Sequence, residues 1–163
     1  MILFIDDEPR QTQVYREALG LDFKRTVRNY ANIIPEDITS LEFNKTDIIY
    51  LDAVDVAHDI MMARIDSIEL IILDIMMASG QKFGLEETEY GLSTGIVLLE
   101  KLREQPEGKS IPVIVLTNVY DPKAAEELRK DLHCDVIQKE HLMPDKLSSE
   151  VKKHLEKAHN GEG

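Results

Sequence analysis

The sequence predicts an α/β protein built on a doubly wound sheet of five parallel strands. Three short runs, at residues 2–5, 70–73 and 111–116, are continuously apolar, as strands covered on both faces are. Segments with the three-to-four residue spacing of amphipathic helices separate these runs. Strands that alternate with helices form parallel sheets through right-handed crossovers, so this alternation gives the fold class.

Apolar spacing and helix-breaking residues place the remaining elements. We expect helices at 9–20, 54–66, 93–104, 122–132 and 144–158, and a brief strand at 135–138. Pro9 is typical of a first helical turn, and Gly20 is typical of a helix end. The inner face of this first helix is then expected to carry Val14, Ala18 and Leu21.

Residues 22–53 allow two interpretations, because both 25–31 and 47–51 could form the second strand of the sheet. We favour 47–51, since it is mostly apolar and a predicted helix follows it directly. Residues 22–45 then form an insertion that precedes the strand.

Composition restricts the class of protein and its partners. A chain of 163 residues fits one domain; we expect residues 1–158 to form it and 159–163 to be a flexible tail. The chain is 43% hydrophobic and 31% charged, with no signal-peptide pattern and no apolar run near the length of a membrane span, so a cytoplasmic protein is expected. Its net charge of -12 repels nucleic-acid phosphates and anionic membranes, so neither is expected as a partner.

Cysteine and histidine give no indication of a thiol or zinc site. The lone Cys134 cannot form an intramolecular disulfide and is interpreted as a buried core or rim residue. The five histidines are scattered, without ligand spacing or cysteine partners. Candidate chemistry therefore lies with the carboxylates.

Polar side chains follow the ends of the predicted strands. Asp6 and Asp7 follow the first strand, Asp74 the third, Thr117 the fourth and Lys139 the fifth. Ligands of such sheets bind beyond the carboxyl ends of the strands, so we expect these five side chains at one edge. Carboxylates from two strands can bind a hard divalent cation through oxygen. Two adjacent aspartates alone could equally be a helix cap and a first-turn acid, but Asp74 and Lys139 favour a site.

The motifs around these residues resemble those of response-regulator receiver domains, the CheY-like superfamily of two-component signal transduction. They are Ile5-Asp6-Asp7-Glu8-Pro9, Leu73-Asp74-Ile75-Met76-Met77, Val113-Ile114-Val115-Leu116-Thr117 and Val136-Ile137-Gln138-Lys139. They occur in the family's order, and the resemblance covers about residues 2–157. It implies a flavodoxin-like receiver topology with insertions near 22–45 and 78–92.

The resemblance also implies roles for the site residues. Asp74 would be the phosphoacceptor, and Mg²⁺ would be bound by Asp6, Asp7, Asp74 and the backbone carbonyl of Met76. Lys139 and Thr117 would contact phosphoryl oxygens. This chemistry is physically coherent, because a divalent cation offsets the repulsion between an attacking carboxylate and an anionic phosphoryl group.

The implied function is that of a stand-alone phosphorylated signalling protein rather than an enzyme with turnover. Its donor would be a histidine kinase or a histidine phosphotransfer protein, and it would dock to a downstream protein effector or pass the phosphoryl group along a phosphorelay. It would act as a monomer or weak homodimer. One alternative is a pseudo-receiver that binds partners without phosphorylation. A Mg²⁺-dependent phosphohydrolase is disfavoured, because its general acid is typically two residues beyond the nucleophile and that residue is Met76.

The chain departs from the family pattern at several places, three of which bear on the site. Glu140 replaces the usual proline after Lys139, so a trans peptide bond is expected there. Val136 occupies a position that is often aromatic in the family, where the aromatic side chain swings inward when Thr117 moves on activation, so this coupling is expected to be absent here. The loop at 78–92 is longer than usual and contains three glycines, so it could be a mobile flap that gates the acceptor or selects a partner, or a neutral insertion.

Overall fold

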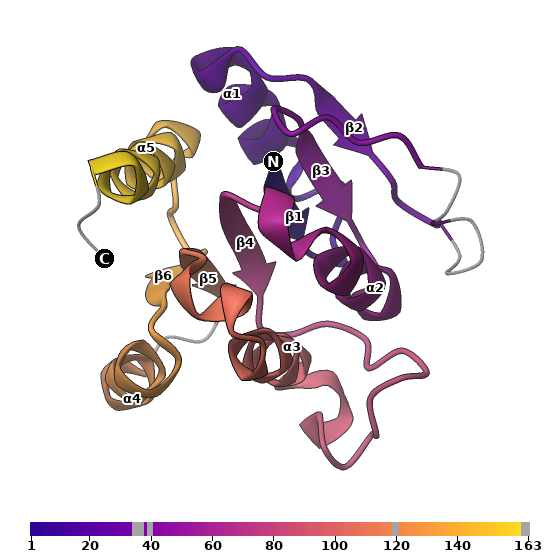
Figure 1. The fold of residues 1–163 in the computed structure, drawn as a ribbon. Helices are drawn as coiled ribbons and strands as arrows, with labels where there is room; N and C mark the ends of the chain where they lie inside the picture. The colour runs from indigo at the N-terminus through magenta and orange to yellow at the C-terminus, as the bar shows by residue number, and fades with distance from the viewer. Residues whose placement is uncertain (34–37, 39–40, 119–120, 161–163) are drawn as a thin grey trace.

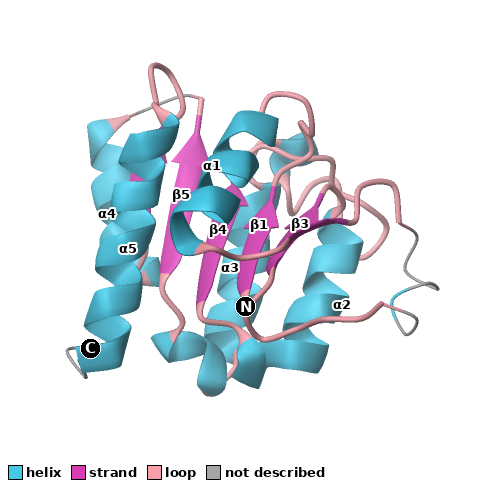
Figure 2. Cartoon of the chain, turned by 90° about the horizontal axis from the view of Figure 1, so that it is seen from above, coloured by secondary structure: helices cyan, strands magenta, loops and turns pink. Residues whose placement is uncertain are grey.

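A sheet of parallel strands runs through the protein in the order β2-β3-β1-β4-β5-β6 (Figure 1). The computed structural model describes residues 1–33, 38, 41–118 and 121–160. The strands in these residues are β1 (Ile2–Ile5), β2 (Val27–Asn29), β3 (Ile48–Leu51), β4 (Leu70–Asp74), β5 (Val113–Thr117) and β6 (Asp135–Gln138). Figure 2 shows the arrowheads of the labelled strands at the same edge of the sheet, so their carboxyl ends share that edge.

Helices cover both faces of the sheet (Figure 1). On one face α1 (Gln13–Phe23) contacts α5 (Pro144–Asn160). On the other face α2 (Val54–Arg64) contacts α3 (Thr94–Glu104), which contacts α4 (Pro122–Leu132). Three short 3-10 helices complete the described elements: η2 (Ile65–Ser67), η3 (Glu89–Gly91) and η4 (Glu107–Ser110).

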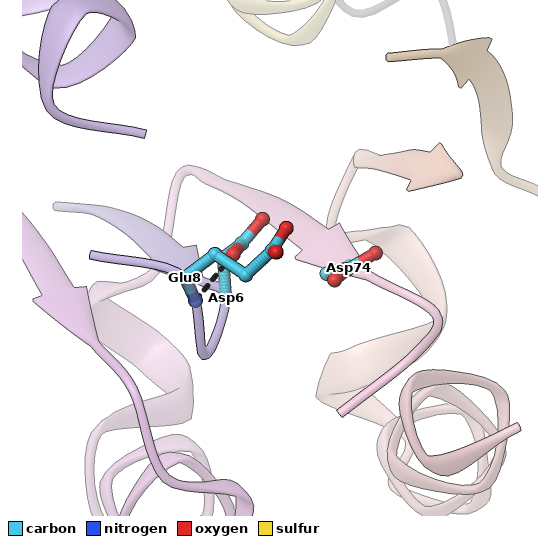
Figure 3. A group of neighbouring side chains, drawn as sticks. All are labelled: Asp6, Glu8 and Asp74. Carbon is cyan, nitrogen blue, oxygen red and sulfur yellow. Dashed lines mark hydrogen bonds between the residues drawn. The ribbon is translucent and has the colours of Figure 1, made fainter. Parts of the chain in front are cut away.

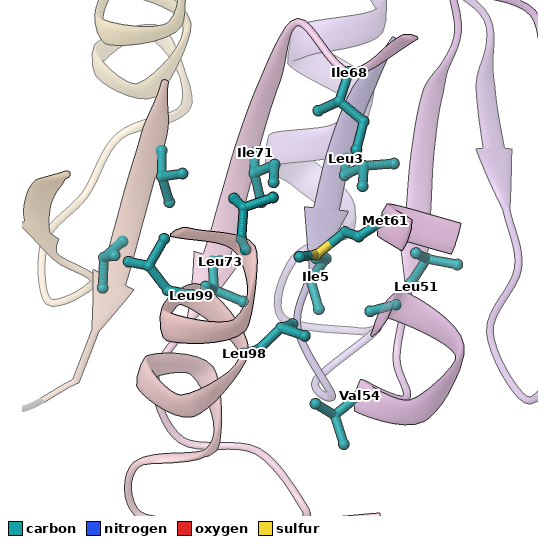
Figure 4. Close-up of a cluster of buried hydrophobic side chains, with 14 of the residues drawn as sticks. Leu3, Ile5, Leu51, Val54, Met61, Ile68, Ile71, Leu73, Leu98 and Leu99 are labelled. Atoms are coloured by element: carbon teal, nitrogen blue, oxygen red, sulfur yellow. The ribbon is translucent and has the colours of Figure 1, made fainter. Parts of the chain in front are cut away.

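The hydrophobic core is divided into two clusters by the sheet. Leu3 and Ile5 of β1 belong to the cluster under α2 and α3, which also contains Met61 and Leu98 (Figure 4). Alternate residues of the same strand, such as Phe4, belong to the cluster under α1 and α5. All of these side chains are almost fully buried. A strand with both faces covered reads as a continuous apolar run, which is why the central strands were predictable.

The prediction of five strands was wrong, because both candidate segments in 22–53 are strands. The short β2 pairs in parallel with β3, from Val27 opposite Ile48 to Asn29 opposite Tyr50. As an edge strand, β2 is half-buried to exposed and lacks an apolar run. The predicted insertion at 22–45 therefore contains the end of α1 and all of β2. Its residues 34–37 and 39–40 lie outside the described part of the chain.

The first helix begins and ends later than the sequence predicted. Residues 9–12 form turns, and α1 continues past Gly20 to Phe23. Val14 and Leu21, which were expected inside, are 53% and 79% exposed, whereas Arg16 is buried. A buried arginine on the inner face hides the helix phase from a hydropathy pattern. Gly20 serves close packing rather than helix termination, since a Cβ there would lie 2.8 Å from Cγ2 of Val27.

Other boundaries agree more closely with the expected ones. Helix α4 has the predicted bounds, and α5 continues to Asn160, two residues past the expected end. Residues 161–163 of the expected tail lie outside the described residues. No helix in the described residues combines the length and hydrophobicity of a membrane span.

Candidate functional site

Three carboxylates meet at the carboxyl edge of the central strands (Figure 3). Asp6 directly follows β1 and Asp74 ends β4, and these two strands are neighbours in the sheet. Both residues are buried, with 0% and 2% of their surface exposed. Together with Glu8 they offer three carboxylate oxygens that lie within 4.8 Å of one another.

Glu8 joins this group because the chain turns sharply after β1. Oδ1 of Asp6 accepts a hydrogen bond of 2.9 Å from the Glu8 backbone N–H, which closes a local turn and brings Glu8 beside Asp6. Asp7 is not part of the group: its Oδ2 accepts a hydrogen bond of 3.1 Å from the Ala78 backbone N–H. We name residues 6–9 the acidic turn. Glu8 was not among the residues predicted for the site. The signal that could have indicated it is the run of three consecutive acids, Asp6-Asp7-Glu8, after β1.

Lys139 lies among the three carboxylates. Its backbone N–H donates to the carbonyl of Thr117 at 2.8 Å, which continues the pairing of β6 with β5. Its Nζ is 2.8 Å from Oδ2 of Asp6, 3.0 Å from Oδ2 of Asp74 and 3.6 Å from Oε2 of Glu8. The side chain is only 11% exposed, so these ion pairs are weakly screened by solvent.

Burial and mutual repulsion oppose ionisation of the acids. Burial, followed by the charge of Asp6, raises the pKa of Asp74 to about 6, although Lys139 acts in the opposite direction. Burial also raises the pKa of Asp6. For Lys139, burial alone would lower the pKa, but the contacts with Asp6 and Asp74 raise it overall. One ammonium group therefore faces three carboxylates.

This arrangement fits a hard divalent cation. Mg²⁺ prefers oxygen ligands and is held by a few carboxylates together with water. Oδ1 of Asp74 is buried and has no hydrogen-bond partner within the described residues. A cation bound there would satisfy that oxygen and would reduce the excess negative charge.

Thr117 and Met76 stand close to these residues in the fold. Thr117 ends β5 and is 4% exposed; β5 is the strand next to β4. Met76 is half-buried in the bend two residues after Asp74. Of the predicted site residues, the structure thus brings Asp6, Asp74 and Lys139 into contact, places Thr117 and Met76 on neighbouring positions of the same edge, and turns Asp7 towards Ala78.

Known structures resemble this fold, although no protein-family model and no curated protein matches the sequence. The signal receiver domain of a putative Luxo repressor protein from Vibrio parahaemolyticus aligns with a TM-score of 0.66 and 17% identity, over 98% of this chain and 92% of that chain. A response regulator receiver domain protein from Clostridium thermocellum aligns with a TM-score of 0.65 and 18% identity, over 96% and 94%. A CheY-like receiver domain protein from Methanospirillum hungatei JF-1 gives 0.62 and 15%, over 98% and 96%.

This chain has the receiver fold. Identities below one fifth support the fold alone, and the alignments extend over nearly the whole chain, as the motifs implied. The resemblance based on Asp6, Asp74, Thr117 and Lys139 is therefore matched by the three-dimensional fold.

Two of the expected departures from the receiver pattern can be followed in the structure. The described residues contain no cis peptide bond, which confirms the trans bond expected between Lys139 and Glu140. Two residues later, the turn is completed by a hydrogen bond of 3.0 Å from the Leu142 N–H to the Lys139 carbonyl. Val136 is buried in β6 as part of the core cluster under α2 and α3.

The loop after Asp74 is tied to the receiver fold rather than left free. Asp55, in the first turn of α2, accepts hydrogen bonds from the backbone N–H groups of Gln81 (2.7 Å) and Lys82 (3.1 Å). Phe83 is 6% exposed and packs edge-to-face on the ring of His58, with centroids 5.7 Å apart. We name residues 75–93 the acceptor loop.

The rest of the acceptor loop is closed on itself and on α3. The hydroxyls of Ser79 and Thr88 share a buried hydrogen bond of 2.6 Å, and Oγ1 of Thr94 donates to the carbonyl of Met77 at 2.7 Å. Gly95 allows α3 to approach the acceptor itself, since a Cβ there would lie 2.0 Å from the Asp74 carbonyl oxygen. These contacts favour a fixed loop over the mobile flap that its glycines suggested.

Proposed function

We propose that this protein is a phosphorylated receiver that accepts a phosphoryl group on Asp74 with the help of Mg²⁺. The donor is a histidine kinase or a histidine phosphotransfer protein, and the phosphorylated form signals by docking to another protein in the cytoplasm. The observation that carries the proposal is the position of Lys139, whose Nζ lies 2.8 Å from Asp6 and 3.0 Å from Asp74 at the carboxyl edge of the sheet.

Asp74 is the nucleophile. One of its carboxylate oxygens attacks phosphorus, a new O–P bond forms, and the bond from phosphorus to the donor nitrogen breaks. Asp6, Glu8 and Asp74 would hold the divalent cation, with Asp7 and the Met76 carbonyl as the further ligands that the receiver resemblance implies. When bound, the cation neutralises charge on the acceptor and on the phosphoryl oxygens.

Lys139 and Thr117 act on the transferred group. In the unphosphorylated protein the ammonium of Lys139 keeps Asp74 ionised next to Asp6, because it lowers the energy of both carboxylates. Once the phosphoryl group is attached, the same ammonium pairs with one of its oxygens and the Thr117 hydroxyl donates to another. Movement of Thr117 then alters the neighbouring surface of α4, β6 and α5, which partners recognise.

A phosphohydrolase is disfavoured on chemical grounds. Turnover of an aspartyl phosphate needs a group that protonates the leaving oxygen and then activates water, and the residue two positions beyond Asp74 is Met76. A methionine side chain can do neither.

The decisive experiment is to incubate the protein with Mg²⁺ and a small phosphodonor and to measure its intact mass. We expect a gain of one phosphoryl group that is stable in acid, labile in base and absent from Asp74→Asn. Asp52→Asn is the matched control, because Asp52 follows β3 at the same edge but accepts hydrogen bonds from the Asn32 N–H outside the cluster. An unmodified wild type that still binds Mg²⁺ would favour a pseudo-receiver that only docks to partners.

A further inference from the structure

A buried arginine on α1, Arg16, has no role in the proposed phosphoryl transfer. Arg16 is 5% exposed, and its guanidinium carbon lies 3.8 Å from the ring centroid of Tyr50 on β3. Burial lowers the pKa of Arg16, while nearby Tyr50, Glu17 and Asp6 act in the opposite direction. Burying an arginine costs free energy unless the guanidinium group is hydrogen-bonded or paired with other groups. Its Nε has no hydrogen-bond partner within the described residues. The guanidinium is therefore held by its other contacts, the ring of Tyr50 and the hydrogen bond of Nη2.

Those contacts lead to the acidic turn. Nη2 of Arg16 donates a hydrogen bond of 2.5 Å to the carbonyl of Pro9. The hydroxyl of Tyr50 donates one of 2.5 Å to the carbonyl of Asp6, in fully buried surroundings. Oγ1 of Thr12 donates one of 3.0 Å to the carbonyl of Glu8. Side chains from β3, from α1 and from Thr12, the residue before α1, thus bind three of the four carbonyls of the turn.

The carbonyls of the turn determine where its carboxylates point. Each side chain leaves the backbone beside the carbonyl that is bound, so a fixed carbonyl fixes the origin of the Asp6 and Glu8 side chains. Tyr50 is 0% exposed, and burial raises its pKa further above the neutral range, so its hydroxyl remains a donor. The guanidinium of Arg16 is stacked on the Tyr50 ring, so it restrains the ring that carries that hydroxyl.

We propose that Tyr50 and Arg16 are positioning residues that set the divalent-cation affinity of the acidic turn. They touch neither the cation nor the phosphoryl group and act through the backbone carbonyls of Asp6 and Pro9. This inference rests on the proposed function, because it assumes the cation site formed by Asp6, Glu8 and Asp74. Groups that orient metal ligands from behind typically change metal affinity by about 10–100-fold when they are removed.

Tyr50→Phe tests the proposal, since it keeps the ring under Arg16 and removes only the hydroxyl. We expect the Mg²⁺ dissociation constant, measured by calorimetry, to rise by about tenfold. Arg16→Lys keeps the positive charge but loses the planar fork, so it should also weaken Mg²⁺ binding, through geometry rather than charge. In phosphorylation assays the Mg²⁺ concentration for half-maximal rate should rise, while the rate at saturating Mg²⁺ should change little.

Tyr15→Phe is the matched control. The Tyr15 hydroxyl on α1 also donates to a carbonyl, that of Leu142 at 2.8 Å, which belongs to the turn after Lys139 and not to the acidic turn. A purely structural role predicts similar losses of thermal stability in both tyrosine variants and wild-type Mg²⁺ affinity in both. If Tyr50→Phe binds Mg²⁺ as tightly as Tyr15→Phe, the inference is wrong and the proposed function stands. If the wild type neither binds Mg²⁺ nor becomes phosphorylated, both are wrong.

Discussion

Asp74 is ionised at neutral pH although its surroundings raise its pKa and so favour the protonated form. Its pKa of about 6 in the folded protein lies above its ordinary value of 3.8, because of burial and then the charge of Asp6. A carboxyl group whose pKa is raised by folding stabilises the fold only while it is protonated. Without metal, stability should therefore fall as pH rises from about 4 to 6 and remain reduced above that range. A bound divalent cation would relieve this destabilisation, because it offsets the buried negative charge of Asp74 and Asp6.

The first prediction is that Asp74→Asn stabilises the metal-free protein. At pH 7.5 with chelator present, we expect the free energy of unfolding to increase by about 1–3 kcal/mol. The reason is that the substitution removes a buried carboxyl group whose pKa folding raises from 3.8 to about 6. The gain should shrink as pH falls from 6 towards 4, where the wild-type carboxyl is protonated. Urea unfolding at several pH values measures this. A loss of stability at pH 7.5 would contradict the assignment, and Asp52→Asn is the control.

The second prediction concerns which neighbour of Asp6 binds the metal. Glu8 belongs to the three-carboxylate cluster, whereas Asp7 accepts a hydrogen bond from Ala78. We expect Glu8→Gln to raise the Mg²⁺ dissociation constant by more than Asp7→Asn does, because only Glu8→Gln removes a carboxylate of the cluster. Calorimetric titration of the two variants compares them directly. The reverse order would favour Asp7 over Glu8 as a ligand beside Asp6, in line with the ligand set that the receiver resemblance implies.

At the scale of elements, the acceptor loop is attached to α2 by side chains of that helix. Asp55 is 8% exposed and binds two consecutive backbone N–H groups of the loop, while the neighbouring Asp59 pairs with Lys82 in a partly exposed ion pair. Charge-assisted hydrogen bonds of the first kind contribute more than exposed ion pairs of the second. Asp55 therefore contributes more to the position of the loop than the Asp59–Lys82 pair does.

A third prediction follows for Asp55→Asn. Replacing one carboxylate oxygen by an amide removes an acceptor, so we expect amide hydrogens of residues 79–84 to exchange about tenfold faster or more, in line with roughly 1.5–3 kcal/mol for a charged hydrogen bond. Asp59→Asn should have little effect. Hydrogen exchange read by mass spectrometry resolves the two variants. Equal and slow exchange in both would mean that other contacts hold the loop.

Sequence patterns predicted some elements well and others poorly, for a reason that is visible in their burial. The central strands β1, β4 and β5 are buried on both faces, so their residues are apolar throughout. Strand β2 is held by backbone pairing to β3 and needs no apolar run. Helix α1 turns a buried arginine inward, and this reverses the face that hydropathy would choose.

At the scale of the whole molecule, the site stands where the direction of chain winding reverses. Strand β1 lies between β3 and β4, with α1 on one face of the sheet and α2 and α3 on the other (Figure 1). Crevices at such switch points are where open α/β sheets bind ligands. The cation site thus joins the two halves of the sheet through Asp6 and Asp74.

The fourth prediction is that Mg²⁺ stabilises the entire fold. A ligand that binds only the folded state adds about 2.7 kcal/mol when its concentration is 100 times the dissociation constant. We expect the melting temperature of the wild type to rise steadily with Mg²⁺ and to respond far less in Asp6→Asn. Differential scanning calorimetry at constant ionic strength measures this. A rise of the same size in Asp6→Asn would place the bound ion elsewhere.

The sequence by itself determined the fold class, the central strands and the residues that gather at the carboxyl edge. These follow from local facts: continuous apolar runs mark doubly covered strands, and polar residues directly after them must share an edge. Only the tertiary structure decided that Glu8 faces Asp74 while Asp7 faces Ala78, that β2 joins the sheet, and that Arg16 and Tyr50 hold the acidic turn. Each of these depends on contacts between residues distant in the chain or on the direction of a turn, and no periodicity in the sequence encodes either.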